Sequence, residues 1–183
     1  MKIIQGTPVD NTDFVAEVPT YMGANSLHLF AMGFLEMAEI SSELAVKNSC
    51  SIDAVIPATL YSMRHSVELF LKYVVYDMHV VEEGVSVPGH PVGDIFAKHK
   101  AMLEVAFECE PASGFGWRDW LRRFESVIQG VHDIDPNGQA IRYPADLKLV
   151  ANQGGGYTLS TKHLRSCLAV VRALYHEYDQ RNC

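Results

Sequence analysis

Apolar residues recur at helical rather than strand spacing along most of the chain. Positions three and four apart carry apolar side chains, which is the period of one helix face. Sustained alternation of apolar and polar residues, the signature of a half-buried strand, is not seen. The pattern predicts five helices, over about 26–46, 54–79, 94–107, 117–131 and 161–179. We therefore expect an all-α fold, a bundle of four to five amphipathic helices.

The first predicted helix, 26–46, is apolar on two sides. Leu27, Phe34 and Ala38 lie on one side, while Leu29 and Met32 add apolar side chains to another. A helix that is apolar on two sides lies at the centre of a bundle or in a subunit interface. This pattern favours a homodimer.

Local sequence marks the ends of two helices. Asp53 is a candidate N-cap for the second helix, where Pro57 is tolerated only near the first turn. Ser160 can cap the last helix, and Leu159 with Leu164 fits a hydrophobic staple around that cap.

Residues of about 132–159 form a long polar loop between the fourth and fifth helices. The sequence Asp135-Pro136-Asn137-Gly138 is a strong turn signal. Ile141 and Tyr143 give the loop apolar side chains to bury, so we expect it to be ordered and packed on the bundle.

The same loop begins like a calcium-binding loop but does not continue as one. Asp133, Asp135 and Asn137 have the spacing of the first ligands, yet the position that needs a bidentate Glu is Pro144. We predict no metal site and no cofactor.

Composition narrows the class of protein. The chain has 183 residues, 48% hydrophobic and 20% charged, which indicates one globular domain over 1–183 with an irregular segment at 1–24. The net charge of -7 excludes a chain-wide basic surface for nucleic acid. Four scattered cysteines without a CxxC pair argue against zinc and disulfides. With no signal peptide or membrane-spanning run, we expect a cytoplasmic protein and no membrane partner.

Three segments in order resemble a known family. The second helix reads Tyr61-Ser-Met-Arg-His-Ser-Val-Glu-Leu-Phe-Leu-Lys72, and His99 precedes Met102-Leu103 on the third. Asp135-Pro-Asn-Gly138 then comes shortly before Arg142-Tyr-Pro144. This order resembles bacterial proteins of the HEPN class, with their "RHSxELxLK" helix, "HxxxL" segment and "DPxGxxxRYP" loop. The resemblance covers residues 60 to 178.

The HEPN resemblance implies a helical bundle that is usually dimeric, and an association with RNA cleavage, toxin–antitoxin pairs or anti-phage defence. The class signature is an Arg followed by a His after four to six residues, whereas three residues separate Arg172 from His176 here. In a metal-independent endoribonuclease, His176 would act as general acid or base and Arg172 would stabilise charge on the phosphate. Residues four apart on a helix are neighbours, so the geometry permits this.

A second group of polar residues is a candidate binding or structural cluster. Arg64, Glu68 and Lys72 share one helix face, as a solvated ion-pair ladder or with Glu68 holding Arg64 inside the bundle. His99 lies on an apolar face, as a hydrogen-bonded core residue or a catalytic one. We expect Arg142 to turn inward toward Glu68, with Asp135 or Asp146 as local competitors, because an unpaired buried guanidinium is costly. The predicted cluster is Arg64, Glu68, Lys72, His99, Asp135, Arg142 and Tyr143.

Two further polar surfaces have both a structural and a functional interpretation. Arg165 and Asp179 share a stripe of the last helix with Arg172 and His176, which is either its solvated side or an RNA-facing surface. Arg118, Arg122 and Arg123 form a basic edge on the fourth helix that could follow a phosphate backbone, or simply surround its tryptophans.

These observations leave two leading hypotheses. The first is a HEPN-like homodimer that acts on or binds RNA or a nucleotide in bacterial defence or a toxin–antitoxin pair, together with a protein encoded nearby. The alternative is a non-catalytic helical dimerisation or interaction module, such as an antitoxin-like or accessory subunit. A small-molecule enzyme of another class ranks third, because Gly-rich phosphate loops and metal-ligand clusters are absent from the sequence.

Overall fold

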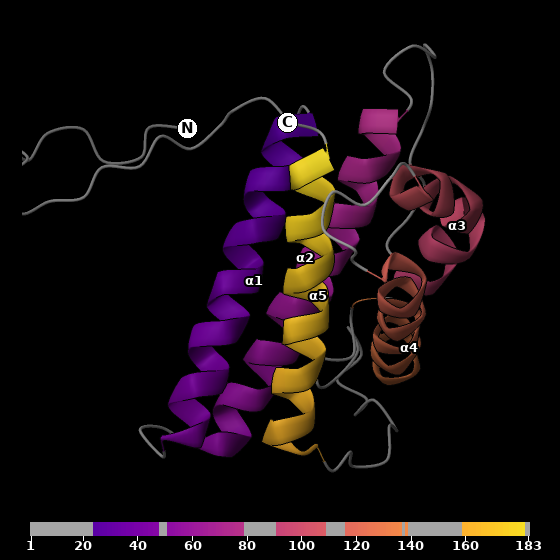
Figure 1. The fold of residues 1–183 in the computed structure, drawn as a ribbon. Coiled ribbons are helices and arrows are strands. Elements are labelled where there is room, and N and C mark those ends of the chain that lie inside the picture. Colours follow the sequence, from indigo (N-terminus) through magenta and orange to yellow (C-terminus); the bar gives the residue numbers. More distant parts are fainter. Residues whose placement is uncertain are drawn as a thin grey trace, which may run out of the picture.

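The described part of the chain folds into helices alone. The computed structural model describes residues 24–47, 51–78, 91–108, 116–136, 138 and 159–181. Within these ranges it contains five helices and no strand (Figure 1). They are α1 (Ala24–Val46), α2 (Ile52–Met78), α3 (Val92–Glu108), α4 (Trp117–Ile134) and α5 (Thr161–Arg181). The predicted all-α bundle is confirmed.

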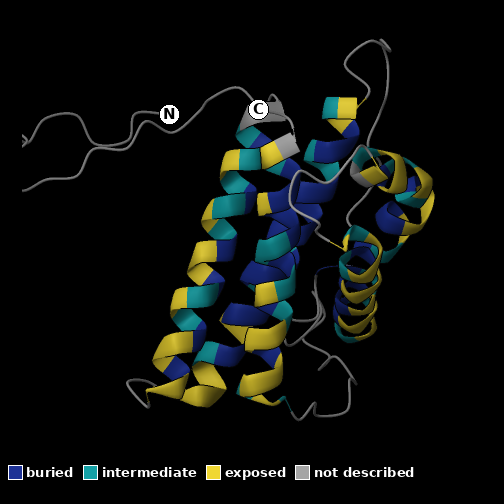
Figure 2. Cartoon of the chain, in the orientation of Figure 1, coloured by how far each residue is buried: buried dark blue, intermediate teal, exposed yellow. Residues whose placement is uncertain are grey.

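The helices form two groups that meet at α2 and α5. The long helices α1, α2 and α5 run beside one another, with α1 at one outer edge of the bundle (Figure 1). The shorter α3 and α4 pack on each other, α3 also on α2 and α4 also on α5. Each helix turns its buried residues inward, as Figure 2 shows. This arrangement leaves the outer side of α1 uncovered by the other described helices.

Aromatic side chains join the two groups at the centre of the core. Phe70 of α2 stacks on Tyr175 of α5, with ring centroids 3.8 Å apart. It also meets Phe124 of α4 edge-on at 6.4 Å. All three residues are fully buried, so the core is continuous across the bundle.

A short hydrogen-bond chain links the three long helices inside this core. The Ser66 hydroxyl of α2 donates to the Ala31 carbonyl of α1 over 2.7 Å and lies 3.0 Å from the Tyr175 hydroxyl of α5. Because Ser66 has one hydroxyl hydrogen and gives it to Ala31, Tyr175 is the donor to Ser66. Burial raises the pKa of Tyr175 well above its usual value. The phenol therefore stays protonated and keeps this bond.

The cap predicted for α5 is confirmed, and the one predicted for α2 is wrong. The His163 N–H donates to Ser160 Oγ over 3.4 Å at the start of α5. In α2 the helix begins at Ile52, so Asp53 lies in its first turn and Pro57 lies inside the helix. Pro57 is tolerated there because it faces solvent, although it offers no N–H to the carbonyl one turn earlier.

Two other expectations are corrected. Helix α4 continues to Ile134, so residues 132–134 are helical and the connection to α5 starts at Asp135. In α1, helical spacing places Met37 and Leu44 with Leu27 and Ala38, but only Leu27 and Ala38 are buried, while Met37 and Leu44 are exposed. The reason is that α1 lies at the edge of the bundle and only one of its two apolar faces meets α2 and α5.

Candidate functional site

The first candidate site is an ion-pair cluster buried under the end of α4. Arg64 of α2 is 1% exposed and Glu68, one turn later, is 2% exposed. Arg64 Nη1 donates to Glu68 Oε2 over 3.0 Å, and Lys72 Nζ donates to Glu68 Oε1 over 2.8 Å. The Asp135 carboxylate lies 3.8 Å from Arg64 Nε. The structure therefore places Arg64 inside the bundle, with Glu68 between its two cationic neighbours.

The turn that follows α4 closes over this cluster. The Asp135 carbonyl accepts from the Gly138 N–H at 3.3 Å, the bond of the turn expected here, and from Arg64 Nε at 3.3 Å. Gly138 has a φ of 71°, in the left-handed region that favours glycine. A Cβ at Gly138 would lie 2.6 Å from the Arg64 guanidinium carbon. Glycine thus permits both the turn and the close approach to Arg64.

Enclosure and charge balance favour a structural role for this cluster. Arg64 and Lys72 supply two positive charges, and Glu68 and Asp135 supply two negative ones. A phosphate would meet no net positive charge from these four side chains, and Arg64 and Glu68 have almost no exposed surface. Burying charges requires such pairing, so the cluster's evident role is to hold the turn after α4 against α2.

Two histidines lie on α2 and α3. His99 of α3 is buried. His65 of α2 is half-buried, with Phe34 edge-on at 4.5 Å and Tyr61 stacked at 5.7 Å between ring centroids. Its Nδ1 lies 4.0 Å from Glu68 Oε2. Aromatic packing accounts for the position of the His65 ring, and a role of His99 stays a prediction.

The second candidate site is a surface hollow of about 410 Å³ between α1 and α5, which Arg172 and His176 both line. Arg172 is held there by Glu39 of α1. Its Nε donates to Glu39 Oε1 over 3.1 Å, and its Nη2 donates to Glu39 Oε2. These bonds raise the pKa of Arg172. Glu39 occupies the Nε and Nη2 side of this guanidinium and balances its charge, so a phosphate would compete with this carboxylate.

His176 and Asp179 of α5 also line this hollow. His176 is exposed, and its Nε2 accepts a hydrogen bond of 2.9 Å from the Gln180 amide. Asp179 lines the same hollow, and its two carboxylate oxygens lie 3.0 and 3.1 Å from His28 Nε2 of α1. His28 therefore carries its ring hydrogen on Nε2 when neutral.

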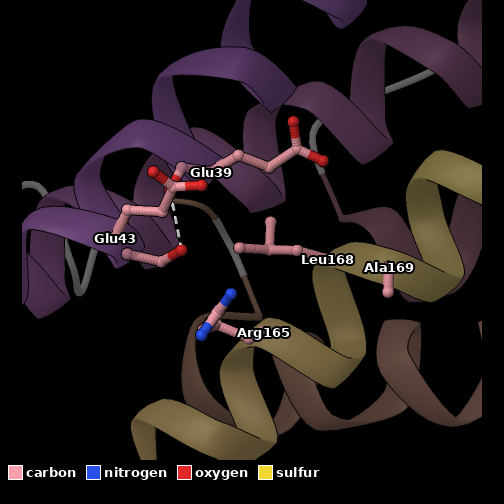
Figure 3. Close-up of a pocket in the computed structure, with 6 residues that line it drawn as sticks. Glu39, Glu43, Arg165, Leu168 and Ala169 are labelled. Carbon is pink, nitrogen blue, oxygen red and sulfur yellow. Dashed lines mark hydrogen bonds between the residues drawn. The ribbon is translucent and has the colours of Figure 1, made fainter. Parts of the chain in front are cut away.

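A smaller hollow of about 200 Å³ continues along the same two helices, as Figure 3 shows. Glu39 and Glu43 of α1 line it on one side, and Arg165, Leu168 and Ala169 of α5 line it on the other (Figure 3). The wall that α1 contributes is thus acidic, and it stands opposite Arg165 and Arg172 of α5. Of the two arginines in the stripe predicted on the last helix, Arg172 is paired with Glu39, whereas Arg165 is exposed.

The basic edge predicted on α4 is likewise partnered. Arg118 lies 5.0 Å from the Trp117 ring and 3.5 Å from the Glu108 carboxylate. Arg123 lies 5.3 Å from the Trp120 ring, and Arg122 donates to Asp119. Surrounding tryptophans and acids account for these arginines.

Some expectations lie outside the described residues. They include most of the loop over 132–159, with Asn137, Arg142 and Tyr143, so the inward turn of Arg142 stays a prediction. The irregular segment predicted at 1–24 also lies outside them, except for Ala24, which begins α1. Among the residues that the structure describes, no group of three His, Cys, Asp or Glu is placed to hold a metal ion. No helix in those ranges combines the length and apolar character needed to cross a bilayer.

The sequence did not predict which residues of α1 pair with Arg172 and Asp179 of α5. Glu39 lies 133 positions before Arg172, and His28 lies 151 before Asp179. Nothing local in the sequence signals either contact, because α1 and α5 meet only in the folded bundle.

Comparisons with protein-family models, curated proteins and solved structures give no match. No family or homologue therefore identifies the chain as a HEPN protein, and the resemblance of residues 60 to 178 stays an expectation. The structure establishes an all-α bundle of five helices within its described residues.

Proposed function

We propose that this protein is a HEPN-like helical domain that works as an interaction module and binds a partner through the outer face of α1. The observation that carries this proposal is an exposed apolar face on an otherwise well-packed helix. Ile40 is 61% exposed, and Leu29, Met37 and Leu44 share its side of α1. Exposed apolar patches of this kind mark protein–protein contact sites.

The polar residues of the two candidate sites also support this proposal, because each of them already has a partner within the fold. Arg64 and Glu68 stabilise the fold, and Arg172 is held by Glu39. An interaction module needs no preorganised catalytic group, whereas an enzyme needs one in reach of its substrate. The homodimer predicted from the sequence stays a prediction, as does the setting of bacterial defence or toxin–antitoxin pairing.

Co-purification from the native host tests the proposal with a matched pair of variants. Ile40→Glu places a charge on the exposed α1 face, and Val105→Glu places the same charge at a 54% exposed position on α3. We expect the tagged full chain to lose its partners with Ile40→Glu and to keep them with Val105→Glu. Identical partners for the wild type and both variants would refute the proposal.

RNA cleavage is the second candidate, because Arg172 and His176 line one open hollow. His176 would take the proton of a 2'-hydroxyl or protonate the leaving oxygen, and Arg172 would turn from Glu39 to the phosphate. His176→Ala should then abolish cleavage of RNA, while His163→Ala, at an exposed position on the same helix, should not. Equal cleavage by the wild type and His176→Ala would exclude this role.

A further inference from the structure

The exposed apolar face of α1 has the spacing of a helix-binding seam. Gly33, Met37, Ile40 and Leu44 follow one another at intervals of four, three and four residues, which is the spacing of the a and d positions of a coiled coil. All four are exposed, and nothing lies within 4 Å of a Cβ built at Gly33. We call these four residues the α1 seam. Its Gly33 end offers an opening into which a partner side chain can insert.

One edge of the α1 seam is acidic. Glu36 and Glu43 precede Met37 and Leu44, which places them at the g positions that choose coiled-coil partners by charge. Both glutamates are exposed. Lys47, directly after this helix, lies 3.7 Å from Glu43 in the same chain, and both side chains are exposed. The edge therefore presents two glutamates beside the apolar residues, one of them next to a lysine of its own chain.

A second copy of the chain fits this edge poorly. An antiparallel pair related by a two-fold axis would bring the same edge of both helices together, so that Glu36 and Glu43 would face glutamates. A parallel pair would bring the glutamates to the opposite edge of the other copy, where Phe34 and Ser41 lie. Gly33 would then face its own copy and leave that layer of the seam poorly filled. Neither arrangement supplies a cation to the acidic edge.

We propose that the α1 seam binds an amphipathic helix of a different protein, with apolar residues at heptad spacing and Lys or Arg along the edge that meets Glu36 and Glu43. This inference rests on the proposed interaction function and names the chemistry of the partner. The apolar layers provide the buried surface, and the basic edge sets partner choice and orientation.

Two synthetic peptides, both 23 residues long like α1, test the inference. Both carry Leu at the a and d positions, one has Lys at e and g, and the other has Glu there. Fluorescence anisotropy with the full chain should show binding of the Lys peptide about tenfold tighter or more, with an affinity that falls as salt is added. The double variant Glu36→Lys, Glu43→Lys should prefer the Glu peptide.

Ile40→Glu separates docking on the seam from general attraction to an acidic protein. It adds negative charge, so nonspecific binding of the Lys peptide would strengthen, whereas docking on the seam would be lost. Val105→Glu should leave binding unchanged. Circular dichroism checks that both variants keep their helices.

Four results would overturn the inference. Equal binding of both peptides would remove the role of the acidic edge. A dimer at micromolar concentration that Ile40→Glu dissociates would assign the seam to a second copy. A monomer that binds neither peptide would mean that the α1 seam does not bind such a helix and that another part of the same chain could cover it. Native partners that require Ile40 but carry no basic amphipathic helix would refute this inference and leave the interaction function standing.

Discussion

Gly138→Ala should destabilise the protein far more than its one added methyl group suggests. The residue sits at the end of the turn after α4 with a φ of 71°. Holding a non-glycine residue in the left-handed region costs about 1–2 kcal/mol. The new Cβ would also lie 2.6 Å from the Arg64 guanidinium carbon, which is inside van der Waals contact.

The second part of the cost depends on whether Arg64 can move aside. An arginine at the surface would swing away at little cost, but Arg64 is almost fully buried and is held by Glu68 and Asp135. Breaking a buried pair outright costs about 3–5 kcal/mol, and a shifted guanidinium loses only part of that. Together with the backbone strain, we expect Gly138→Ala to lower the free energy of unfolding by about 2–4 kcal/mol.

Urea denaturation followed by far-ultraviolet circular dichroism measures this difference. Gly130→Ala is the matched control, because Gly130 lies within α4 and nothing lies within 4 Å of its Cβ. It should raise stability by about 0.5–1 kcal/mol through helix propensity. A Gly138→Ala protein within about 0.5 kcal/mol of the wild type would refute the view that the turn locks onto Arg64.

Three further predictions test the packing and the hollow. The raised pKa of Tyr175 keeps the folded phenol protonated while the unfolded one ionises near pH 10, so stability should fall as pH rises above about 10, and Tyr175→Phe should show a shallower fall in alkaline urea titrations. A Cβ at Gly93 would lie 2.9 Å from the His132 ring, so Gly93→Ala should destabilise by about 1–2 kcal/mol, and adding His132→Ala should relieve the clash; additive losses in thermal unfolding would contradict this. Arg172→Ala removes a half-exposed pair with Glu39 and should change stability by no more than about 1 kcal/mol, so a loss of several kcal/mol in chemical denaturation would mean that this pair is central to the fold.

Local patterns in the sequence were enough to predict where the helices lie and where some of them begin. The stripe of α4, with Leu121, Phe124 and Val131, repeats at helical period, and all three residues are buried. Ser160 caps α5 as its residue type and position predict. Such features depend on side chains within a few positions of one another, so a linear pattern contains the information they need.

Tertiary structure alone decided which apolar face of α1 is buried and which charges are neutralised. Met37 and Ala38 are adjacent and both apolar, yet only Ala38 faces α2 and α5. The sequence places Arg172 on a polar stripe of α5, and only the structure shows that Glu39, 133 positions earlier in the chain, binds its guanidinium. The physical reason is that burial and pairing depend on which helices lie side by side. The spacing of apolar residues shows that a helix has an apolar face, but it does not show which other helix packs on that face.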